Sequence, residues 1–547
     1  MPLTSQEIIE IYGRLRGSTV WSALVQTALR LPHKVAVVDG ENRYTYAQVV
    51  ERASRLASGL YGAGLKKGDV AAVYMKNSIE LVTVFYALQK LGVIIAWINP
   101  NYRETESRFI IGNSNARAVF IFPEWLGYDY TAAVAKMAPE LPDLSLIVAA
   151  GVEMDTKAGG IRLAGLGTLT RGGESDADHE PVGPDDLSML LFTSGTTGKP
   201  KGATIRQYQV VLGGWSYALG VDATEEDSFI GFLPMAHSYG CGALLVQPFI
   251  LGATLVAMDR FTPAGAFAVI EKERCTIQLG SPAHYLMELR DDSRKSRDLK
   301  SLRAGLIAGQ IAPEGLIRRV EEEMGIYIAS FLGSSEVGPG LSIILPYGSS
   351  MELRERSIGY PLEGTEIRVV DPATGEERAP GEPGELLLKG WHVMAGYWKN
   401  PEETANQLKN GWLHTGDLAA RDPDGSVRIL GRIKEWINRG GLKVIPSELE
   451  GLLVKMPGVE EAFVVGTQNP ILGESICACV KLAPGAEVSL KGVRSFLERK
   501  VAPHKLPDEL FKVEEFPKMP GGIKVNKFGA GGLAELAGSS KTKETLR

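Results

Sequence analysis

The chain has 547 residues, which is more than one hydrophobic core usually supports, so two or more domains are expected. Apolar residues make up 44% of the sequence and charged residues 23%, which is the composition of an ordinary globular protein. The formal net charge of −6, from 59 basic and 65 acidic side chains, argues against nucleic acid as a principal partner.

The cysteines and the apolar stretches bear on the cellular compartment. Four cysteines are too few for a disulfide framework, and we interpret Cys477 and Cys479 as buried thiols on one face of a strand. Residues 1–17 lack the apolar core of a signal peptide, and polar residues interrupt the most apolar stretches, 82–98 and 244–258. These observations predict a soluble, cytoplasmic protein without a transmembrane segment.

Helix and strand patterns alternate over the first 180 residues. Thr45 is expected to cap an amphipathic helix whose apolar residues recur at helical spacing from Val49 to Leu60. Apolar runs typical of strands buried on both faces of a parallel sheet lie at residues 70–74, 93–98, 118–122 and 144–149. This alternation indicates a layered α/β architecture. The Gly- and Asp-rich residues 153–184 are expected to form a loop or linker.

A further apolar run, residues 187–192, opens into a segment dense in anion-binding groups, residues 191–202. Its hydroxyls donate hydrogen bonds, its lysines add positive charge, and its glycines let backbone N–H groups approach an anion closely. The segment therefore predicts a phosphate cradle. It is not a Walker A loop, because Thr193 stands at that motif's first glycine and Pro200 at its Ser or Thr. A mobile flap over a triphosphate is expected instead.

Three later strand patterns each end in a polar turn that contains glycine. The strands are expected at residues 227–233, 305–308 and 326–331, and the turns after them include His237, Gly309 and Glu336. Ligands of open α/β sheets bind beyond the carboxyl ends of the strands, so these turns are expected to meet at one cleft.

The sequence changes character after residue 358. Short alternating strands with Pro and Gly turns over residues 358–430 predict a β-rich subdomain. Ser447 and Glu450 have the spacing of a capping box, and the patterns that run on to Lys527 suffice for a domain of roughly 100 residues. The residues from 529 onward are expected to form a loose tail.

The segment 191–202 resembles the phosphate-binding signature of the adenylate-forming enzymes, which include acyl- and aryl-CoA synthetases, adenylation domains of peptide synthetases and luciferases. Further motifs, in the family's order, extend the resemblance from about Thr19 to Lys527. It implies an α/β fold with a large N-terminal lobe of layered α/β subdomains, a β-rich subdomain and a small mobile α+β C-terminal domain. On this resemblance the adenylate-forming (AMP-binding) domain spans residues 1–433, and the mobile domain spans residues 434–547 after a hinge at Lys434.

The resemblance also implies how the nucleotide is held. Glu336 stands where the family has the catalytic glutamate that positions Mg²⁺ on ATP, and Asp417 and Arg432 stand at the ribose contacts. Leu332 replaces the family's usual tyrosine and Ser335 its threonine, so aromatic stacking on the base is lost. Thr196 is expected to act in catalysis as well as binding. The remaining implied contacts are Thr193, Ser194, Gly195, Thr197, Gly198, Lys199, Leu332, Ser335 and Lys434.

The acid and CoA sites are implied less directly. His237 resembles the histidine that gates the acyl pocket, and a pantetheine tunnel would run past Gly440 and Gly441. The expected wall of the acid site adds Ser238, Tyr239, Gly309, Gly333 and Gly338. Counted without a gap, Ile523 falls on the family's catalytic lysine position; one inserted residue places Lys524 there, and we predict Lys524. A cation at that position would neutralise the charge that builds between carboxylate and α-phosphate.

Together these residues predict an AMP-forming carboxylate–CoA ligase with ATP, Mg²⁺ and CoA as cofactors and co-substrates. It would activate a fatty or aryl acid as the acyl-adenylate and transfer the acyl group to CoA. One alternative is a stand-alone enzyme that adenylates an aryl or amino acid and loads it onto a carrier protein. Another is a non-catalytic or luciferase-like descendant, which the full set of site residues disfavours. The identity of the acid depends on pocket depth, which local motifs do not give.

Overall fold

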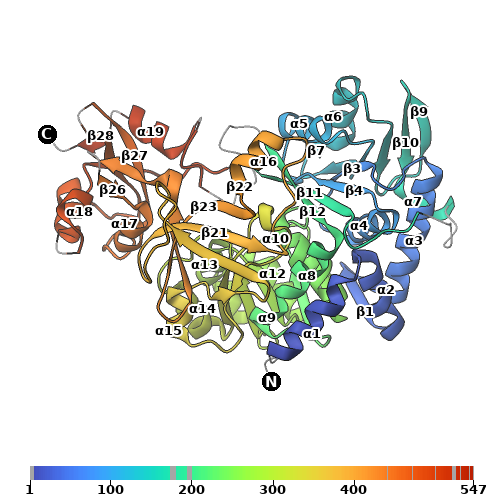
Figure 1. Ribbon diagram of the computed structural model, residues 1–547, viewed down its shortest axis with the longest axis horizontal. Helices are drawn as coiled ribbons and strands as arrows, with labels where there is room; N and C mark the ends of the chain where they lie inside the picture. The colour runs from blue at the N-terminus through green and yellow to red at the C-terminus, as the bar shows by residue number, and fades with distance from the viewer. Residues whose placement is uncertain are drawn as a thin grey trace. The chain divides into compact units, whose positions relative to one another are not determined.

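The structure of the protein is a computed structural model (Figure 1). It describes residues 5–172, 180–193, 200–439, 442–470, 472–498, 500–519, 525–529, 531–540 and 542–545. The chain divides into two compact units: the first contains Met1–Glu366 and Leu388–Leu413, and the second contains Ile367–Leu387 and His414–Arg547. Lys434 lies inside the second unit, and the domain boundary expected there stays a prediction.

One sheet of the first unit has eight strands in the order β12-β11-β4-β3-β5-β8-β10-β9. The central strands β4, β3, β5 and β8 are parallel and buried along their whole length, as their apolar runs predict. All four predicted strands are confirmed. The strands of this sheet are β3 (Val70–Tyr74), β4 (Ile94–Trp97), β5 (Ala118–Ile121), β8 (Leu146–Ala149), β9 (Asp155–Ala158), β10 (Ile161–Gly165), β11 (Leu187–Thr193) and β12 (Lys201–Arg206).

The helix α3 (Tyr46–Gly62) begins at the cap that the sequence predicts. The Thr45 hydroxyl accepts a hydrogen bond from the Gln48 N–H, and the Gln48 side chain accepts one from the Thr45 N–H. No helix in the described ranges is both long and apolar enough to span a membrane. The other helices of the first unit are α1 (Ser5–Arg16), α2 (Val20–Arg30), α4 (Ile79–Leu91), α5 (Glu104–Ser114), α6 (Tyr130–Met137), α7 (Leu166–Gly172), α8 (Gln207–Ser216), α9 (Ala218–Val221), α10 (Ser238–Gly240), α11 (Gln247–Leu251), α12 (Pro263–Glu273), α13 (Pro282–Arg290), α14 (Leu316–Met324), α15 (Met351–Arg356) and α16 (Pro401–Gln407).

The second sheet of the first unit has nine strands in the order β19-β18-β17-β16-β15-β13-β14-β1-β2. From β17 to β1 the strands are parallel, so their carboxyl ends lie at one edge of the sheet. β13, β16 and β17 are the three strands whose turns carry predicted site residues. The strands are β1 (Val35–Asp39), β2 (Asn42–Thr45), β13 (Ser228–Gly231), β14 (Thr254–Ala257), β15 (Ile277–Gly280), β16 (Ala304–Ile307), β17 (Tyr327–Leu332), β18 (Ile343–Ile344) and β19 (Tyr360–Pro361).

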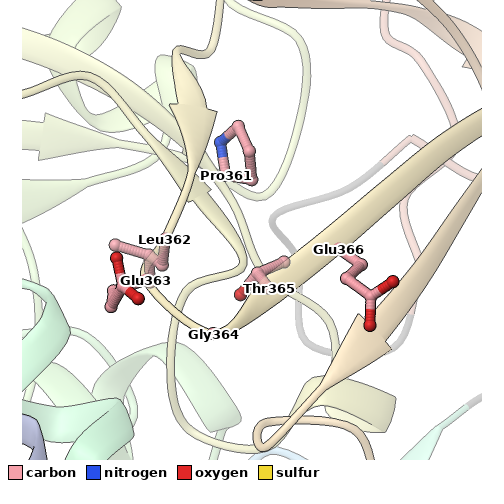
Figure 2. Close-up of a pocket in the computed structure, with 6 residues that line it drawn as sticks. All are labelled: Pro361, Leu362, Glu363, Gly364, Thr365 and Glu366. Atoms are coloured by element: carbon pink, nitrogen blue, oxygen red, sulfur yellow. The ribbon is translucent and has the colours of Figure 1, made fainter.

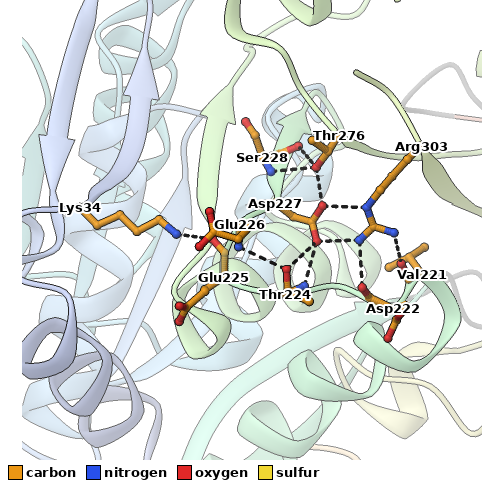
Figure 3. A network of polar contacts seen from close by, with 10 residues as sticks. All are labelled: Lys34, Val221, Asp222, Thr224, Glu225, Glu226, Asp227, Ser228, Thr276 and Arg303. Carbon is orange, nitrogen blue, oxygen red and sulfur yellow. Dashed lines mark hydrogen bonds and ion pairs between the residues drawn. The ribbon is translucent and has the colours of Figure 1, made fainter. Parts of the chain in front are cut away.

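The amino edge of the same sheet is closed by a polar network around Asp227 (Figure 3). Asp227, Thr276 and Arg303 immediately precede β13, β15 and β16. The Arg303 guanidinium contacts both Asp227 carboxylate oxygens, at 2.6 and 2.9 Å, and the Thr276 hydroxyl donates to Asp227 Oδ1 at 2.7 Å. Burial favours the neutral acid, but these bonds outweigh it and hold the pKa of Asp227 below its usual value. The network fixes three strand starts to one another.

The second unit is built around a six-stranded sheet in the order β26-β25-β28-β29-β30, with β27 paired to β28. α17 and α19 pack against β27 (Figure 1). Cys477 and Cys479 are buried, unoxidised residues of β28, as predicted. The elements are β25 (Ile437–Arg439), β26 (Leu442–Val444), α17 (Pro446–Leu453), β27 (Val459–Asn469), β28 (Gly473–Leu482), α18 (Leu490–Leu497), β29 (Glu509–Lys512), α19 (Leu533–Ser539) and β30 (Glu544–Thr545).

A five-stranded sheet has the order β20-β21-β23-β22, with β24 paired to β23. It corresponds to the predicted β-rich region. Its strands are β20 (Thr365–Val370), β21 (Gly384–Gly390), β22 (Leu408–Lys409), β23 (Trp412–Arg421) and β24 (Val427–Arg432), and a separate two-stranded ribbon consists of β6 (Glu124–Trp125) and β7 (Tyr128–Asp129).

The loop predicted over residues 153–184 is wrong for much of its length. β9 and β10 form an antiparallel pair, β10 also pairs in parallel with β8, and α7 follows. Two of its glycines, Gly159 and Gly160, lie in the turn between β9 and β10 at positive φ, whereas Gly165 and Gly167 lie within β10 and α7.

Two further predictions in the second unit are wrong. α17 begins at Pro446, which fits the first helical position because it has no N–H to leave unpaired, so Ser447 lies inside the helix. The Ser447 hydroxyl donates instead to the Leu430 carbonyl, and no capping box forms with Glu450. The expected loose tail is folded: α19 packs on β27, and β30 pairs with β29.

Candidate active site

The phosphate segment links β11 to β12. These strands pair antiparallel, and Thr193 opposite Lys201 is their last pair before the connection. β11 confirms the strand predicted from residues 187–192, and Thr193 is half-buried at its end. Six predicted phosphate contacts lie outside the described residues: Ser194, Gly195, Thr196, Thr197, Gly198 and Lys199.

Lys201, the second lysine of the segment, is well buried at the start of β12. Its ammonium forms an ion pair with Glu403 of α16 and lies 5.5 Å from the centroid of the Tyr397 ring. The face of an aromatic ring attracts a cation, most strongly where water is excluded. Lys201 is therefore held in place by both a carboxylate and a ring.

Glu336 lies in the 3-10 turn η4 (Ser335–Val337), directly after β17. The Tyr397 hydroxyl donates to Glu336 Oε1 at 3.0 Å, and the Met394 N–H donates to the Glu336 carbonyl at 2.8 Å. Burial, and secondarily the Glu336 carboxylate, raises the pKa of Tyr397 far above its usual value, so the phenol keeps its proton. Within the described ranges the second carboxylate oxygen, Oε2, accepts no hydrogen bond.

The backbone of residues 394–398 runs along β12 and brings these side chains together. Ala203 bridges Tyr397, the Thr204 N–H donates to the Gly396 carbonyl at 3.0 Å, and the Trp398 N–H donates to the Gly202 carbonyl at 2.7 Å. We call Lys201, Glu336, Tyr397 and Glu403 the Tyr397 cluster. Of these four, the sequence predicted Glu336 as a site residue and placed Lys201 in the phosphate segment. It missed Tyr397 and Glu403, which lie about two hundred positions from that segment in no motif that marks them.

The turn after β13 holds the predicted acid-site residues in different environments. His237 is exposed and caps α10, with Nδ1 accepting the Tyr239 N–H at 3.3 Å. Ser238 and Tyr239 are buried. The Tyr239 hydroxyl donates to the Leu306 carbonyl of β16 at 3.0 Å, and its ring packs on Tyr217 and Phe331. Tyr239 thus anchors the turn that presents His237.

The predicted glycines of the acid site also differ. Gly309, after β16, is exposed at φ +90°, and a Cβ there would meet nothing within 4 Å. Gly333 is exposed, but a Cβ there would lie 2.8 Å from the Gly340 carbonyl oxygen. A Cβ at Gly338 would lie 3.2 Å from the Ile205 side chain, so neighbouring atoms limit the space at both positions.

The remaining predicted contacts of the first unit flank Glu336. Leu332 is the last residue of β17, is half-buried and pairs with Ile343 of β18, while Ser335 opens η4. The carboxyl edge of the nine-stranded sheet thus carries Leu332, Ser335 and Glu336 beyond β17 and Gly309 beyond the neighbouring β16. β15 separates β16 from β13, whose turn bears His237.

Asp417 and Arg432 are brought together in the second unit. They are directly opposite one another on β23 and β24, and Arg432 Nε lies 2.7 Å from Asp417 Oδ1. Asp417 is buried, its N–H donates to the Thr415 hydroxyl at 3.0 Å, and Arg432 also donates to the Thr415 carbonyl at 3.1 Å. The two predicted ribose contacts therefore form one fixed, charged pair.

A surface pocket of about 440 Å³ lies within the first unit, along residues 361–366 (Figure 2). Its lining comes from a single turn and strand start, and no predicted site residue contributes to it. The parts of the chain that the structure describes contain no cluster of three or more His, Cys, Asp or Glu side chains suited to a metal ion.

Comparison with known proteins identifies the family. Residues 24–398 match the family of AMP-binding enzymes, and residues 448–522 match the C-terminal domain of AMP-binding enzymes. The chain belongs to the AMP-binding enzyme family. This confirms the resemblance inferred from the phosphate segment.

Relatives of this AMP-binding enzyme extend along most of both chains. The medium-chain fatty-acid–CoA ligase of Escherichia coli (strain K12) is 32% identical over 510 residues, which are 92% of this chain and 88% of that protein. The mitochondrial medium-chain acyl-CoA ligase ACSF2 of Rattus norvegicus is 30% identical over 545 residues, 94% of this chain and 87% of the relative. The crystal structure of the anthranilate CoA ligase AuaEII with anthranoyl-AMP aligns with a TM-score of 0.83 and 26% identity, covering 93% and 96% of the two chains. These matches confirm the predicted α/β fold with a large N-terminal part and a smaller C-terminal domain.

The other predicted residues belong to the second unit. Lys434 is an exposed residue of the 3-10 turn η5 (Ile433–Glu435), which follows β24. Gly440, Gly441 and Lys524 lie outside the described residues.

Proposed function

We propose that this AMP-binding enzyme is an AMP-forming carboxylate–CoA ligase. The acid's carboxylate attacks the α-phosphorus of Mg-ATP, the bond to the bridging oxygen breaks, and acyl-adenylate and pyrophosphate form. The CoA thiol then attacks the acyl carbon, AMP leaves, and the thiol proton passes to solvent. The thiol thus meets an activated acyl group and not a free carboxylate. The CoA ligases among the relatives confirm the predicted class, an ATP-dependent acid–thiol ligase.

The Tyr397 cluster is the structural observation that carries the proposal. It joins β12, which continues the phosphate segment, to η4, which holds Glu336. Mg²⁺ takes oxygen ligands and reaches such enzymes with the triphosphate, and Glu336 offers a carboxylate oxygen that accepts no hydrogen bond from the described residues. In this proposal Glu336 binds the Mg²⁺ of Mg-ATP, while residues 193–199 bind the phosphates through hydroxyls, backbone N–H groups and Lys199.

The other site residues keep the roles that the family motifs suggest. Asp417 binds the ribose hydroxyls, with Arg432 holding its carboxylate in place, because one carboxylate can accept both hydrogen bonds of a diol. Lys524 brings a cation to the reacting carboxylate and α-phosphate. His237 borders the acid, Lys434 is the hinge, and Gly440 and Gly441 lie beside pantetheine.

We propose a medium-chain fatty acid as the substrate class, with aryl acids as the second choice. The 32%-identical bacterial relative and the 30%-identical rat relative are both named as medium-chain ligases, whereas the anthranilate ligase is 26% identical. We propose the cytoplasm as the location of the reaction, and the four free cysteines support this proposal.

Pyrophosphate release across fatty, aryl and amino acids, with and without CoA, tests the proposal. Medium-chain acids should give a slow or single-turnover release with Mg-ATP alone and sustained release with CoA, accompanied by acyl-CoA. No release with any acid would reject the ligase. Release without acyl-CoA, rescued by a phosphopantetheinylated carrier protein, would favour the carrier-loading alternative.

A lysine substitution tests the assignment of Lys524. Lys524→Ala should lower acid-dependent pyrophosphate release by about 100-fold or more, since it removes transition-state charge stabilisation. Thioester formation from preformed acyl-AMP and CoA should survive. An unchanged first half-reaction would show that another residue supplies the cation.

A further inference from the structure

Lys527 is the centre of a largely buried ion-pair cluster in the second unit. Its ammonium lies 2.9 Å from Glu450 Oε1 and 3.3 Å from Glu435 Oε2, and its side chain is only 17% exposed. Burial lowers the pKa of Lys527, but the two carboxylates outweigh burial and raise it, so the group is charged at neutral pH. We call these three residues the Lys527 cluster.

The Lys527 cluster ties together parts of the chain that are distant in sequence. Glu450 lies on α17, and its Oε1 also accepts the Val464 N–H of β27 at 2.9 Å. Glu435 is the last residue of η5 and directly follows Lys434. Lys527 therefore connects the residue beside the proposed hinge to the packed centre of the second unit.

The chain on either side of Lys524 is held by its backbone as well. Lys518 and Val525 form an antiparallel bridge, and the Asn526 N–H donates to the Pro517 carbonyl at 2.7 Å. The Lys527 carbonyl accepts the Ala534 N–H of α19 at 2.9 Å. Lys524 immediately precedes Val525 in the sequence, so residues 525–527 are the described residues that follow it most closely.

We propose that Lys527 is a positioning residue for Lys524. Its ion pairs hold residues 525–527 both to Glu450 of α17 and to Glu435, the residue after Lys434. The inference rests on the proposed function, in which Lys524 supplies the cation for adenylate formation. Three residues of chain span at most about 10 Å, so a shift of the anchor passes to Lys524 with little slack. Misplacement of a catalytic group by about 1 Å can cost on the order of 100-fold in rate.

A second ion pair in the same unit supplies a matched control. Lys543 Nζ lies 3.0 Å from Glu509 Oε2, and its side chain is also 17% exposed. This pair joins the residue before β30 to β29 and includes no residue of the segment around Lys524. Loss of Lys543 removes a comparable interaction without releasing the Lys527 anchor.

The test compares Lys527→Met, Lys527→Arg and Lys543→Met in the two half-reactions. Lys527→Met should lower kcat for acid-dependent pyrophosphate release by about 10- to 100-fold, with KM for ATP and acid within about threefold. Thioester formation from preformed acyl-AMP and CoA should change less than about threefold. Lys527→Arg should recover most of the first rate, and Lys543→Met should leave both rates unchanged.

Several outcomes would overturn the inference. Equal losses in both half-reactions, or a loss in Lys543→Met as large as in Lys527→Met, would indicate a general structural role. Because Lys527→Met leaves Glu450 buried without its cation, the double variant Lys527→Met/Glu450→Gln is tested beside it, with thermal melting as the check on folding. Full pyrophosphate release from this folded double variant would also overturn the inference.

Failure of the proposed function gives a different pattern. If the parent enzyme releases no pyrophosphate with any acid, the ligase proposal fails, and the positioning role of Lys527 in adenylate formation fails with it. If the parent is active and Lys524→Ala keeps full release, the assignment of Lys524 fails, and the positioning role of Lys527 fails with it. Slow release in both Lys524→Ala and Lys527→Met, with thioester formation intact, supports both proposals.

Discussion

The two edges of the nine-stranded sheet differ in how many hydrogen bonds their carboxylates receive from the protein. At the amino edge, Asp227 is bonded by Arg303, by the Thr276 hydroxyl and by the Thr224 N–H (Figure 3). At the carboxyl edge, the Glu336 carboxylate receives one hydrogen bond from the described residues, from the Tyr397 hydroxyl. A buried polar group whose hydrogen-bond partners all lie within the protein stabilises the fold, whereas a group with an unused hydrogen-bond acceptor is available to a ligand. Within one sheet, the Asp227 carboxylate therefore stabilises the fold, and the Glu336 carboxylate is available to a ligand.

The largest effect is expected from a substitution in the Asp227 network at the amino edge of the sheet. Arg303→Met should lower the free energy of unfolding by about 3 kcal/mol or more, because it leaves Asp227 buried without its cation. Urea denaturation measures this loss. The pyrophosphate-release rate per folded molecule should stay within about twofold of the parent. A loss of rate with unchanged stability would show that the amino edge serves catalysis and not the stability of the fold.

The next largest effect is expected from a substitution of Glu336 at the carboxyl edge of the sheet. Glu336→Gln keeps an acceptor for the Tyr397 hydroxyl but removes the charge that the Mg²⁺ of Mg-ATP requires. We expect kcat/KM for pyrophosphate release to fall about 100-fold, equivalent to about 2.7 kcal/mol, with the melting temperature unchanged. Wild-type rates in this variant would remove Glu336 from the site.

A smaller effect is expected from the hydroxyl that orients Glu336. Tyr397→Phe should lower the same rate about 10-fold and stability by about 1 kcal/mol, the usual worth of one hydrogen bond. Tyr327→Phe is the control, because its hydroxyl donates to the Pro346 carbonyl at 3.1 Å and does not touch Glu336. If both variants lose the same activity, the effect does not come from Glu336.

The smallest effect is a pH dependence that sharpens the contrast. The pKa of Asp227 is lowered in the folded state, so its contribution to stability is fully present above the unfolded value, about 3.9, and is lost as the pH falls below it. Urea midpoints measured between about pH 3 and 5 should therefore fall more steeply for the parent than for Arg303→Met. Parallel curves would show that Arg303 does not hold this pKa down.

The sequence predicted elements whose determinants are local. The Thr45 cap sets the start of α3, and the apolar run at residues 70–74 becomes β3 with the same bounds. The spacing of Ser447 and Glu450 gave a wrong prediction of a capping box. α17 begins at Pro446, and the Glu450 carboxylate instead pairs with Lys527, which is distant in the sequence. The folded tail also depends on a distant partner, since β30 forms by pairing with β29.

The candidate site divides in the same way. Motifs predicted Glu336, Asp417 and Arg432, and the last two prove to be cross-strand partners. Tyr397, which orients Glu336, carries no sequence signal, because its role arises from the path of residues 394–398 along β12. Gly333 and Gly338 stay predicted residues of the acid site, and a Cβ at either one would also meet neighbouring protein atoms.

The packing of Gly340 has a consequence for redesign of the enzyme. A Cβ at Gly340 would lie 2.5 Å from the Gly213 Cα of α8, so two main chains touch there with no side chain between them. Gly340 comes four residues after Glu336, so this direct backbone contact lies close in sequence to the carboxylate that we propose binds Mg²⁺. Libraries aimed at new substrates should leave both glycines untouched, because a methyl group at either one would collide with the main chain of the other.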